Sequence, residues 1–447
     1  FWMTAGFRHA DVRELHHEVV SAGPESILNR VRHYWKNWAN HRTRRFDSLS
    51  PSVEQLTRQS LLILCTQIDR DGAIIAANDS DILQFGRDTY SYMWPRDGAL
   101  ISMALDKAGY PELSQRFFLF VHELVTHYGF FLHKYNPDGS AGSSWHPWST
   151  PGGELQFPIQ EDETALVLHA LWEHYQRYHD IELIRQLYQP MVVPCARFLA
   201  SYRDQRTGLP SPSYDLWEER HGIHAFTVAT VWAGLHAASR LARIFGDDAL
   251  AGGWESAAQE IRDAALRAFY DPGLGRFVRT ITIGECGVVD RDPTLDASLA
   301  GLFQFGLVPA GDPRMVRTMQ AVEQRLWCRT PVGGLARYED DYYYQVSRDV
   351  ANVPGNPWFV CTLWLADWYI ARAVSPAHLE RARELIEWVA QHALPSGVLA
   401  EQVHPYTGEP LSVSPLSWSH GALVSTVLDF LAKEEQLARS GWATLLG

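Results

Sequence analysis

Two glutamates in separate aromatic-rich segments are the residues of this chain best suited to chemistry. Glu218 lies in SYDLWEERHG (213–222), and Glu401 lies in GVLAEQVHPYTGEPLSVSPLSWSHG (397–421). Hydrolysis of a glycosidic bond needs one carboxylic acid to protonate the leaving oxygen and one carboxylate to activate water. Two glutamates brought together among tryptophans and tyrosines would supply both groups, so the pattern indicates cleavage of a sugar linkage.

The neighbours of Glu218 favour the acid role over the simpler interpretation of the EE pair as a solvated charge at a helix start. Trp217 is adjacent, and Asp215 lies three residues earlier. Apolar contact and a like charge both raise the pKa of a carboxyl group toward neutral pH. We therefore interpret Glu218 as the acid and Glu219 as a substrate ligand, although the sequence alone does not order this pair.

Glu401 is either an ordinary loop carboxylate or a general base. The second interpretation is supported by PLSWSH, in which Trp418 and His420 open a predicted helix and could wall the same cavity. A base that activates water in an inverting reaction stands about 6.5–9.5 Å from the acid, whereas a separation near 5 Å indicates a retaining nucleophile. We expect the larger separation.

Further residues suited to sugar contact lie in YSYMWPRDGA (90–99). Arg96 and Asp97 are either part of an ordinary helix N-terminus, with Pro95 and an acid in the first turn, or a pair that binds adjacent hydroxyl groups with charge-assisted hydrogen bonds. Tyr90 and Trp94 would supply a stacking surface.

Two more segments are ambiguous alone. Trp145 and Trp148 precede the acidic run 160–163, which at a helix start is most often a capping arrangement. Arg337 in ARYEDD and Trp358 in GNPW fit either turn chemistry or sugar binding.

Helical periodicity dominates the chain, because apolar residues recur at spacings of three and four. After a lead-in over 12–41, the pattern predicts helices near 51–70, 95–109, 111–128, 161–179, 181–204, 225–246, 252–270, 293–306, 313–327, 357–373, 376–393 and 415–437.

The connectors between these helices alternate in length. Those before the second, fourth, sixth, eighth, tenth and twelfth helices are long and rich in Gly, Pro, Trp and acids. In up-and-down helices every second connector emerges at the same end, so the long ones should share one face. The sequence therefore predicts an all-α, double-layered (α/α)6 barrel, with minor β structure in loops and at the N-terminus.

Composition and charge exclude several classes of partner. The net charge of −13, without a Lys/Arg run, argues against nucleic acid and suits a neutral ligand. No apolar run is long enough to span a membrane. The odd, widely spaced cysteines signal neither a disulfide framework nor a zinc site, and no DxDxDG calcium loop is present, so we predict no metal or cofactor.

YSYMWPRDGA, SYDLWEERHG, ARYEDD with GNPWF, and AEQ with PLSWSH occur in an order that resembles glycoside hydrolase family 15, from Ser50 to the C-terminus. The resemblance implies an inverting, exo-acting α-glucosidase that releases β-glucose from α-1,4-linked, and also α-1,6-linked, glucans. Within the family, AEQ and DLWEE fit glucoamylases better than trehalases. The alternative is a trehalase, or a glucodextranase that hydrolyses isomaltose.

The resemblance also implies roles for matching residues, with Glu218 as general acid, Glu219 on the leaving-group side and Glu401 as general base. The remaining expected substrate contacts are Arg96 and Asp97 on the terminal glucose, Tyr90 and Trp94 near the cleavage point, Arg337, the cavity walls Trp358 and Trp418, and the aromatics Trp145, Trp148 and Trp217. Asp215 matches a family acid without a defined role.

Pro95 and QEDE differ from the fungal pattern and resemble the bacterial and archaeal branch. That branch commonly carries a β-sandwich domain and a helical linker before the barrel. Residues 1–49, beginning FWMTAGF, are therefore expected to be the last strand of such a sandwich plus the linker, with the catalytic domain at 50–447. The start of the chain shows no signal peptide, which favours a cytoplasmic location. The sequence does not indicate an oligomeric state.

Other functions remain open from the residues alone. A phosphorylase on a similar barrel would replace the second carboxylate with a basic anion site, and Glu401 argues against that. A carbohydrate-binding protein without catalysis would tolerate loss of either glutamate. A structural helical scaffold is poorly suited to acid-rich aromatic loops at one end.

Overall fold

The computed structural model describes residues 2–40, 45–78, 89–144, 146–147, 149, 153, 157–283 and 289–446. The chain forms two compact units, Phe1–Arg45 and Phe46–Gly447. The second unit begins before the predicted boundary at 49/50, because Leu49 is buried in it and the Ser48 hydroxyl donates a hydrogen bond to Glu434.

The first unit contains two helices, α1 (His9–Ala22) and α2 (Pro24–Ala39), in place of the single lead-in predicted over 12–41. They are separated at Gly23, whose φ of 77° few other residues adopt. Neither helix has a buried residue. Residues 2–6 have no strand partner in the described part of this unit, so their assignment to the last strand of a β-sandwich stays a prediction.

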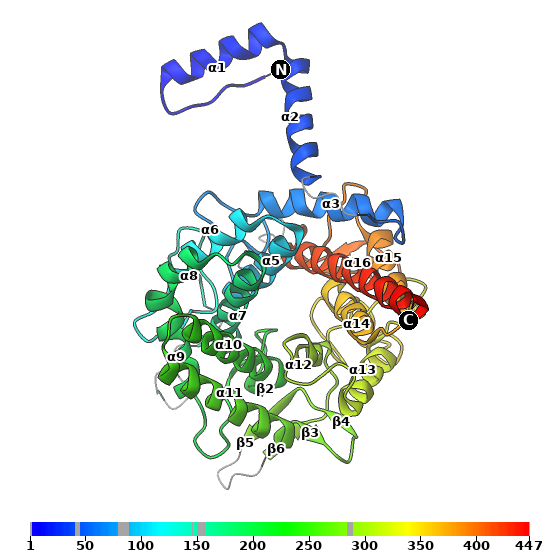
Figure 1. The fold of residues 1–447 in the computed structure, drawn as a ribbon. Helices are drawn as coiled ribbons and strands as arrows, with labels where there is room; N and C mark the ends of the chain where they lie inside the picture. The colour runs from blue at the N-terminus through cyan, green and yellow to red at the C-terminus, as the bar shows by residue number, and fades with distance from the viewer. Residues whose placement is uncertain are drawn as a thin grey trace. The chain divides into compact units, whose positions relative to one another are not determined.

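The second unit alternates inner and outer helices around a ring (Figure 1). The inner helices are α5 (Pro95–Ala108), α7 (Glu161–Tyr178), α10 (Ala225–Ile244), η2 (Ala297–Ala300) continuing into α12 (Gly301–Gln304), α14 (Phe359–Arg372) and α16 (Ser417–Leu446). The outer helices are α3 (Pro51–Thr66), α6 (Pro111–His122), α8 (Ile181–Leu187) continuing through η1 (Tyr188–Val192) into α9 (Val193–Ser201), α11 (Asp248–Ala268), α13 (Pro313–Leu326), and η3 (Pro376–Leu379) continuing into α15 (Glu380–His392).

The inner ring closes because α5 packs against both α7 and α16, and the remaining inner helices contact one another in chain order. This arrangement is an (α/α)6 barrel, which confirms the predicted fold class. Each predicted helix of this unit has a counterpart, and the largest difference is the twelfth, predicted over 415–437 and observed over 417–446.

The burial of the helices explains the two layers. Outer helix α13 buries one stripe, Met315, Met319, Val322 and Leu326, at spacings of three and four. That spacing is typical of a helix with one face on a core. Inner helix α10 is instead buried on nearly all sides. Apolar residues all round a helix therefore mark the inner layer.

Gly234 allows α10 to approach α7 closely. A Cβ at this position would lie 2.7 Å from the carbonyl oxygen of Ala165, a main-chain atom that cannot rotate away. We expect Gly234→Ala to destabilise the fold by about 1–3 kcal/mol through overpacking, measured by urea unfolding. The control is Gly252→Ala on α11, where a Cβ meets nothing within 4 Å. That variant should gain about 0.5–1 kcal/mol from helix propensity, so equal shifts in both variants would contradict the packing argument.

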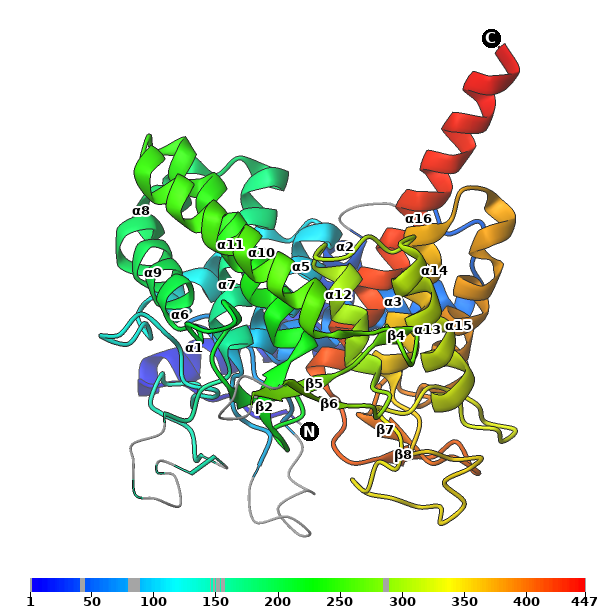
Figure 2. The same ribbon diagram turned by 90° about the horizontal axis from the view of Figure 1, so that it is seen from below.

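The N-terminal ends of the inner helices share one face of the barrel, and long connectors precede them there (Figure 2). These connectors carry the short strands of the unit. One antiparallel sheet has the order β1 (Ser213–Tyr214), β2 (His221–His224), β5 (Thr280–Ile283) and β6 (Val289–Asp292), with Ser213 opposite Gly222 and Ile223 opposite Ile281. Two hairpins pair β3 (Tyr270–Asp271) with β4 (Arg276–Phe277) and β7 (Gln402–Val403) with β8 (Pro410–Leu411). Small β elements thus shape the loop face of the barrel.

No helix in the described ranges has both the length and the apolar character needed to cross a membrane.

Candidate active site

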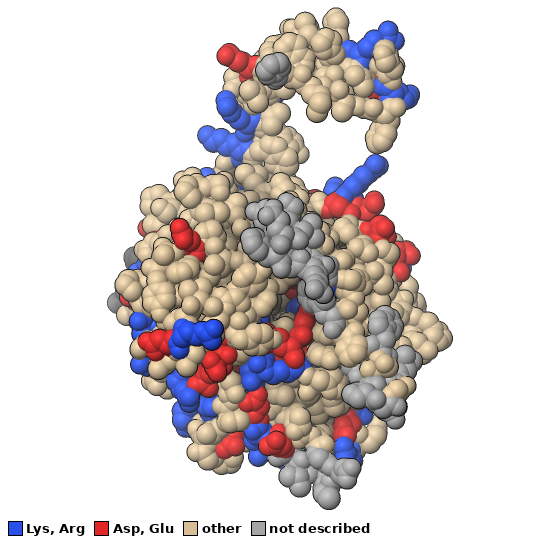
Figure 3. Space-filling view, turned by 180° about the vertical axis from the view of Figure 1, so that it is seen from behind, with Lys and Arg blue, Asp and Glu red and all other residues tan. Residues whose placement is uncertain are grey.

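A cavity of about 500 Å³ opens on the loop face, at the N-terminal ends of the inner helices. The sequence-predicted residues that line it are Tyr90, Trp94, Arg96, Asp97, Trp217, Glu218, Glu219, Arg337, Trp358, Glu401 and Trp418. Acidic and basic side chains gather around a hollow on this face of the barrel (Figure 3). The other two predicted contacts, Trp145 and Trp148, lie outside the described residues.

Glu218 occupies the turn between β1 and β2, and its φ of 63° is unusual for a residue with a side chain. Asp215 holds this turn closed. Its carboxylate accepts hydrogen bonds from the backbone N–H groups of Glu219 and Arg220 at 2.8 and 3.1 Å. Its carbonyl oxygen accepts one from Glu218 at 2.8 Å. Asp215 therefore shapes the backbone that presents Glu218.

The surroundings of Glu218 allow it to hold a proton near neutral pH. Burial raises the pKa of its carboxyl group to about 7, and the positive charges of Arg96 and Lys134 offset part of that rise. The indole N–H of Trp94 donates a hydrogen bond to its Oε1 atom. No cation lies within ion-pair distance of Glu218 among the residues that the structure describes.

Glu219 has a different environment, although it is the next residue. Arg337 donates to one of its oxygens at 2.8 Å, and Arg220 donates to the other at 3.0 Å. The hydroxyl group of Tyr338 also donates to it. These contacts hold Glu219 as a paired carboxylate, which distinguishes two glutamates that the sequence could not order.

Glu401 reaches the same cavity from the loop before α16. It is 5% exposed, and its backbone N–H donates to the carbonyl oxygen of Val413 at 2.9 Å. Burial raises the pKa of its carboxyl group to about 7, while the Ser412 hydroxyl and Arg337 oppose the rise. Two carboxyl groups far apart in the chain thus face one cavity.

Arg337 lies at the centre of a cluster of aromatic rings. Its guanidinium group is 4.8 Å from the ring centre of Trp358, 5.0 Å from Tyr343 and 5.1 Å from Trp217. Two of its nitrogens bind Asp341, each at 2.7 Å. The guanidinium group is therefore fixed in orientation. Its Nη2 atom, which donates to Asp341, also donates to Glu219 at 2.8 Å.

Arg96 is buried with several carboxylates. Its guanidinium group lies 3.2 Å from Asp97, 3.2 Å from Asp162 and 3.1 Å from Glu163. It also donates to Gln160 at 2.6 Å. The acidic run at 160–163 was predicted to be a capping arrangement, but these residues are buried, and Asp162 and Glu163 bind Arg96. Residues 160–163 therefore do not line the cavity themselves, but Gln160, Asp162 and Glu163 hold Arg96, which does.

Several residues that line the cavity were not predicted from the sequence, namely Ala76, Leu216, Tyr342, Tyr343, Tyr344 and Leu416. Tyr343 is the most connected of them, since its hydroxyl group lies 2.7 Å from that of Tyr90. The YYY string directly after ARYEDD was the available signal.

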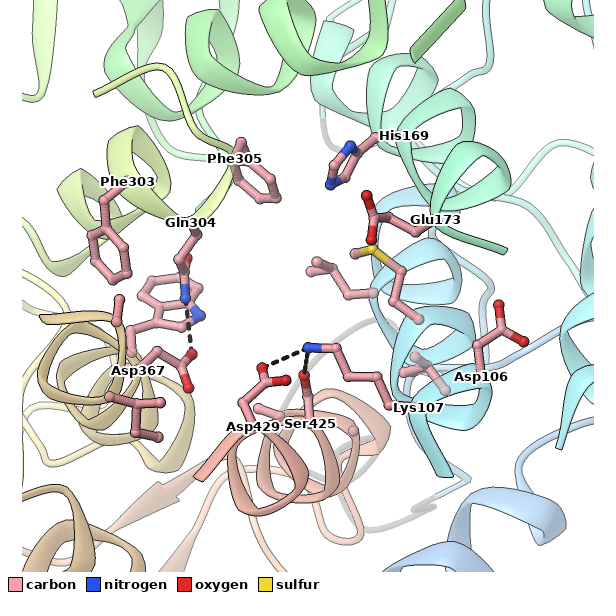
Figure 4. Close-up of a pocket in the computed structure, with 18 of the residues that line it drawn as sticks. Asp106, Lys107, His169, Glu173, Phe303, Gln304, Phe305, Asp367, Ser425 and Asp429 are labelled. Atoms are coloured by element: carbon pink, nitrogen blue, oxygen red, sulfur yellow. Dashed lines mark hydrogen bonds and ion pairs between the residues drawn. The ribbon is translucent and has the colours of Figure 1, made fainter. Parts of the chain in front are cut away.

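A second cavity of about 730 Å³ lies inside the ring of inner helices, lined by residues of α5, α7, α10, α12, α14 and α16 (Figure 4). Lys107 there donates to Asp429 at 2.6 Å and to Ser425 at 2.8 Å, and Gln304 donates to Asp367 at 3.0 Å. Of the residues predicted to bind substrate, Trp418 lines both cavities. Glu218 and Glu401 thus both line the 500 Å³ cavity and not the 730 Å³ one.

Comparison with known proteins identifies relatives over nearly the whole chain. The model of "Glycosyl hydrolases family 15" matches residues 54–428. An uncharacterized glycosyl hydrolase of Methanocaldococcus jannaschii is 28% identical over 92% of this chain and 62% of its own length. Trehalase 2 of Sulfolobus acidocaldarius is 27% identical over 85% of this chain and 64% of its own length.

Among solved structures, a bacterial glucoamylase complexed with acarbose is similar in fold. Its TM-score is 0.73 at 21% sequence identity, over 96% of this chain and 62% of that chain. This chain therefore spans less than two thirds of the length of each of these relatives.

Proposed function

The chain belongs to glycosyl hydrolase family 15, and we propose that it removes glucose from the non-reducing ends of α-linked glucans with inversion of the anomeric carbon. One observation carries this proposal: Glu218 and Glu401, from distant loops, line one cavity, and burial raises the pKa of each to about 7. A pair of carboxyl groups near neutral pKa suits an acid and a base that work together.

In the proposed reaction, Glu218 donates its proton to the glycosidic oxygen as the bond to the anomeric carbon breaks. Glu401, as the carboxylate, takes a proton from the water that attacks the opposite face of the sugar. Glu218 then holds a negative charge and Glu401 holds a proton, so exchange with solvent restores both. Glu219 is unsuited to the acid role, because Arg337 and Arg220 already occupy its two oxygens.

The other lining residues suit the grip of a sugar ring. Arg96 and Asp97 are adjacent, buried and polar, and we assign them to the hydroxyl groups of the terminal glucose. Trp94 and Tyr90 would stack near the cleaved bond, and the rings of Trp358 and Trp418 would form the walls. We assign Glu219 and Arg337 to the leaving-group side.

Linkage preference separates two candidates within the family. AEQ and DLWEE favour a glucoamylase that acts on α-1,4 linkages and also α-1,6 linkages. The similarity to trehalase 2 of S. acidocaldarius favours trehalose as the second candidate. The terminal glucose is the same in both substrates, so the outer loops decide.

The test is a panel of maltose, maltotriose, isomaltose, trehalose, starch and dextran, with the anomers followed by proton NMR during the first turnovers. We expect β-glucose to appear first from maltose and the longer glucans. Trehalose, if cleaved, should give one β-glucose and one α-glucose, since only the attacked sugar inverts. Initial α-glucose from the non-reducing end of maltose would refute inversion, and no hydrolysis of any substrate would refute the proposal.

A further inference from the structure

Two buried histidines lie beside Glu218 and were not part of the predicted site. His133 and His146 are 1% and 3% exposed. One ring nitrogen of each and one carboxylate oxygen of Glu218 lie within 4.8 Å of one another. Three buried atoms have no hydrogen-bond partner among the described residues: His133 Nε2, His146 Nδ1 and Glu218 Oε2. Buried polar atoms nearly always have partners, so this group requires an explanation.

The tautomer of His133 follows from its outer contact. Its Nδ1 atom lies 3.3 Å from the carbonyl oxygen of Pro158. A carbonyl oxygen only accepts, so Nδ1 carries the hydrogen. The Nε2 atom of His133 is left with a lone pair and acts as an acceptor.

The tautomer of His146 is fixed by a chain of two contacts. Arg96 donates to Gln160 Oε1 at 2.6 Å, which sets the orientation of the amide group. The Nε2 atom of Gln160 then faces the Nε2 atom of His146 at 3.1 Å, and the amide nitrogen only donates. His146 therefore accepts at Nε2 and carries its hydrogen on Nδ1.

Both rings stay neutral, so each keeps a single N–H group. Burial lowers the pKa of His133 to about 3 and that of His146 to about 4. The nitrogens left to serve Glu218 are thus one acceptor, His133 Nε2, and one donor, His146 Nδ1.

This pairing suits a carboxyl group better than a metal ion. A metal would need a lone pair from each ring, and His146 offers an N–H group unless its bond from Gln160 breaks. A carboxyl group that gains and loses a proton needs an acceptor in one state and a donor in the other.

We propose that His133 and His146 are positioning residues that hold Glu218 in its two protonation states. The protonated carboxyl group donates to Nε2 of His133, and the carboxylate accepts from Nδ1 of His146. This inference rests on the proposed role of Glu218 as general acid. When Glu218 passes its proton to the leaving oxygen, a small rotation exchanges one partner for the other, and a proton from solvent reverses it. Neither histidine touches substrate in this scheme.

Other groups also act on the pKa of Glu218. Arg96 and Lys134 lower it, the Trp94 hydrogen bond lowers it, and the charge of Asp97 raises it. Tyr90 also faces Glu218. All of these groups remain in the variants below, so a shift reports the histidines.

The test uses two matched variants. In His133→Asn the amide N–H replaces Nδ1 and keeps the bond to Pro158, while the acceptor is lost. In His146→Gln the amide oxygen replaces Nε2 and keeps the bond from Gln160, while the donor is lost. We expect the pKa of Glu218 to fall by about one unit in the first variant and to rise by about one unit in the second.

The pKa is measured by carbon-13 NMR of labelled glutamate, with the Glu218 signal identified by its loss in Glu218→Gln. The alkaline limb of the kcat/KM profile should likewise move to lower pH in His133→Asn and to higher pH in His146→Gln. A structural role alone would not predict shifts of opposite sign, so shifts of one sign, or none, would overturn the proposal. The NMR titration does not depend on turnover, so loss of the proposed function and loss of this inference remain distinguishable.

The unmodified protein provides a second measurement if a variant does not fold. Nitrogen-15 NMR of labelled histidine should show both His133 and His146 with hydrogen on Nδ1. Hydrogen on Nε2 of His146 would overturn the proposal. Stoichiometric zinc binding that is lost in both variants would identify a metal site instead and would also overturn it.

Discussion

Replacement of Glu218 by Gln is expected to lower kcat on maltose by about 10²–10⁴-fold, because an amide of the same shape has no acidic proton for the leaving oxygen. The KM should change little, since the side chain keeps its volume and can still accept from Trp94. Steady-state kinetics on purified protein, with folding checked by circular dichroism, would measure both. Full activity on maltose would end the assignment of Glu218 as the acid.

A substrate that needs no protonation supplies the control. Fluoride leaves without a proton, so Glu218→Gln should hydrolyse α-glucosyl fluoride at most of the rate of the unmodified protein. Glu401→Gln should be slow on both substrates, because water must still be activated. If Glu218→Gln lost activity equally on both substrates, Glu218 would serve binding or folding instead.

The pH dependence should separate the same roles. The pKa of Glu218 is about 7, so kcat/KM on maltose should fall as pH rises through about 7 and the acid ionises. On α-glucosyl fluoride that alkaline limb should be absent.

Arg96→Met is expected to cause the largest loss of stability, about 3–5 kcal/mol, because it leaves a buried cluster of carboxylates without its cation. Asp97, Asp162 and Glu163 each contact Arg96, and burial raises the pKa of all three. Carboxyl groups with raised pKa values stabilise the fold at low pH and lose that contribution as pH rises through the folded pKa. Urea unfolding should therefore show a larger loss at pH 8 than at pH 5.

The matched control is Arg185→Met, which removes an exposed ion pair with Glu182. Its effect should stay within about 0.5 kcal/mol. A comparable loss in both variants, or a loss for Arg96→Met that does not depend on pH, would contradict the role of the buried cluster.

The helices of the barrel could be predicted from the sequence because each one carries a local signal. The apolar stripe of α13 and the proline that begins α5 are visible in single segments. Alternate long connectors then require that their segments meet at one end. The cavity brings together Glu218 and Glu401 as that argument expects.

The details of the loops depend on long-range contacts and could not be predicted. Glu218 was expected just before a helix, but pairing of β1 with β2 builds a hairpin there and places it in the turn, and the distant β5 extends the sheet. The acids at 161–163 look like helix caps in sequence, and only the position of Arg96 explains the burial of Asp162 and Glu163. The tautomer of His146 likewise depends on Gln160, whose orientation Arg96 fixes from another helix.

The shared orientation of the inner helices has a further consequence. The partial positive charge at a helix N-terminus belongs to the main chain, so no substitution in a loop removes it. Every inner helix directs that end toward the mouth that holds the acidic residues. Divergence of the rim during evolution would thus alter which ligands enter, while the scaffold continued to stabilise negative charge at its centre.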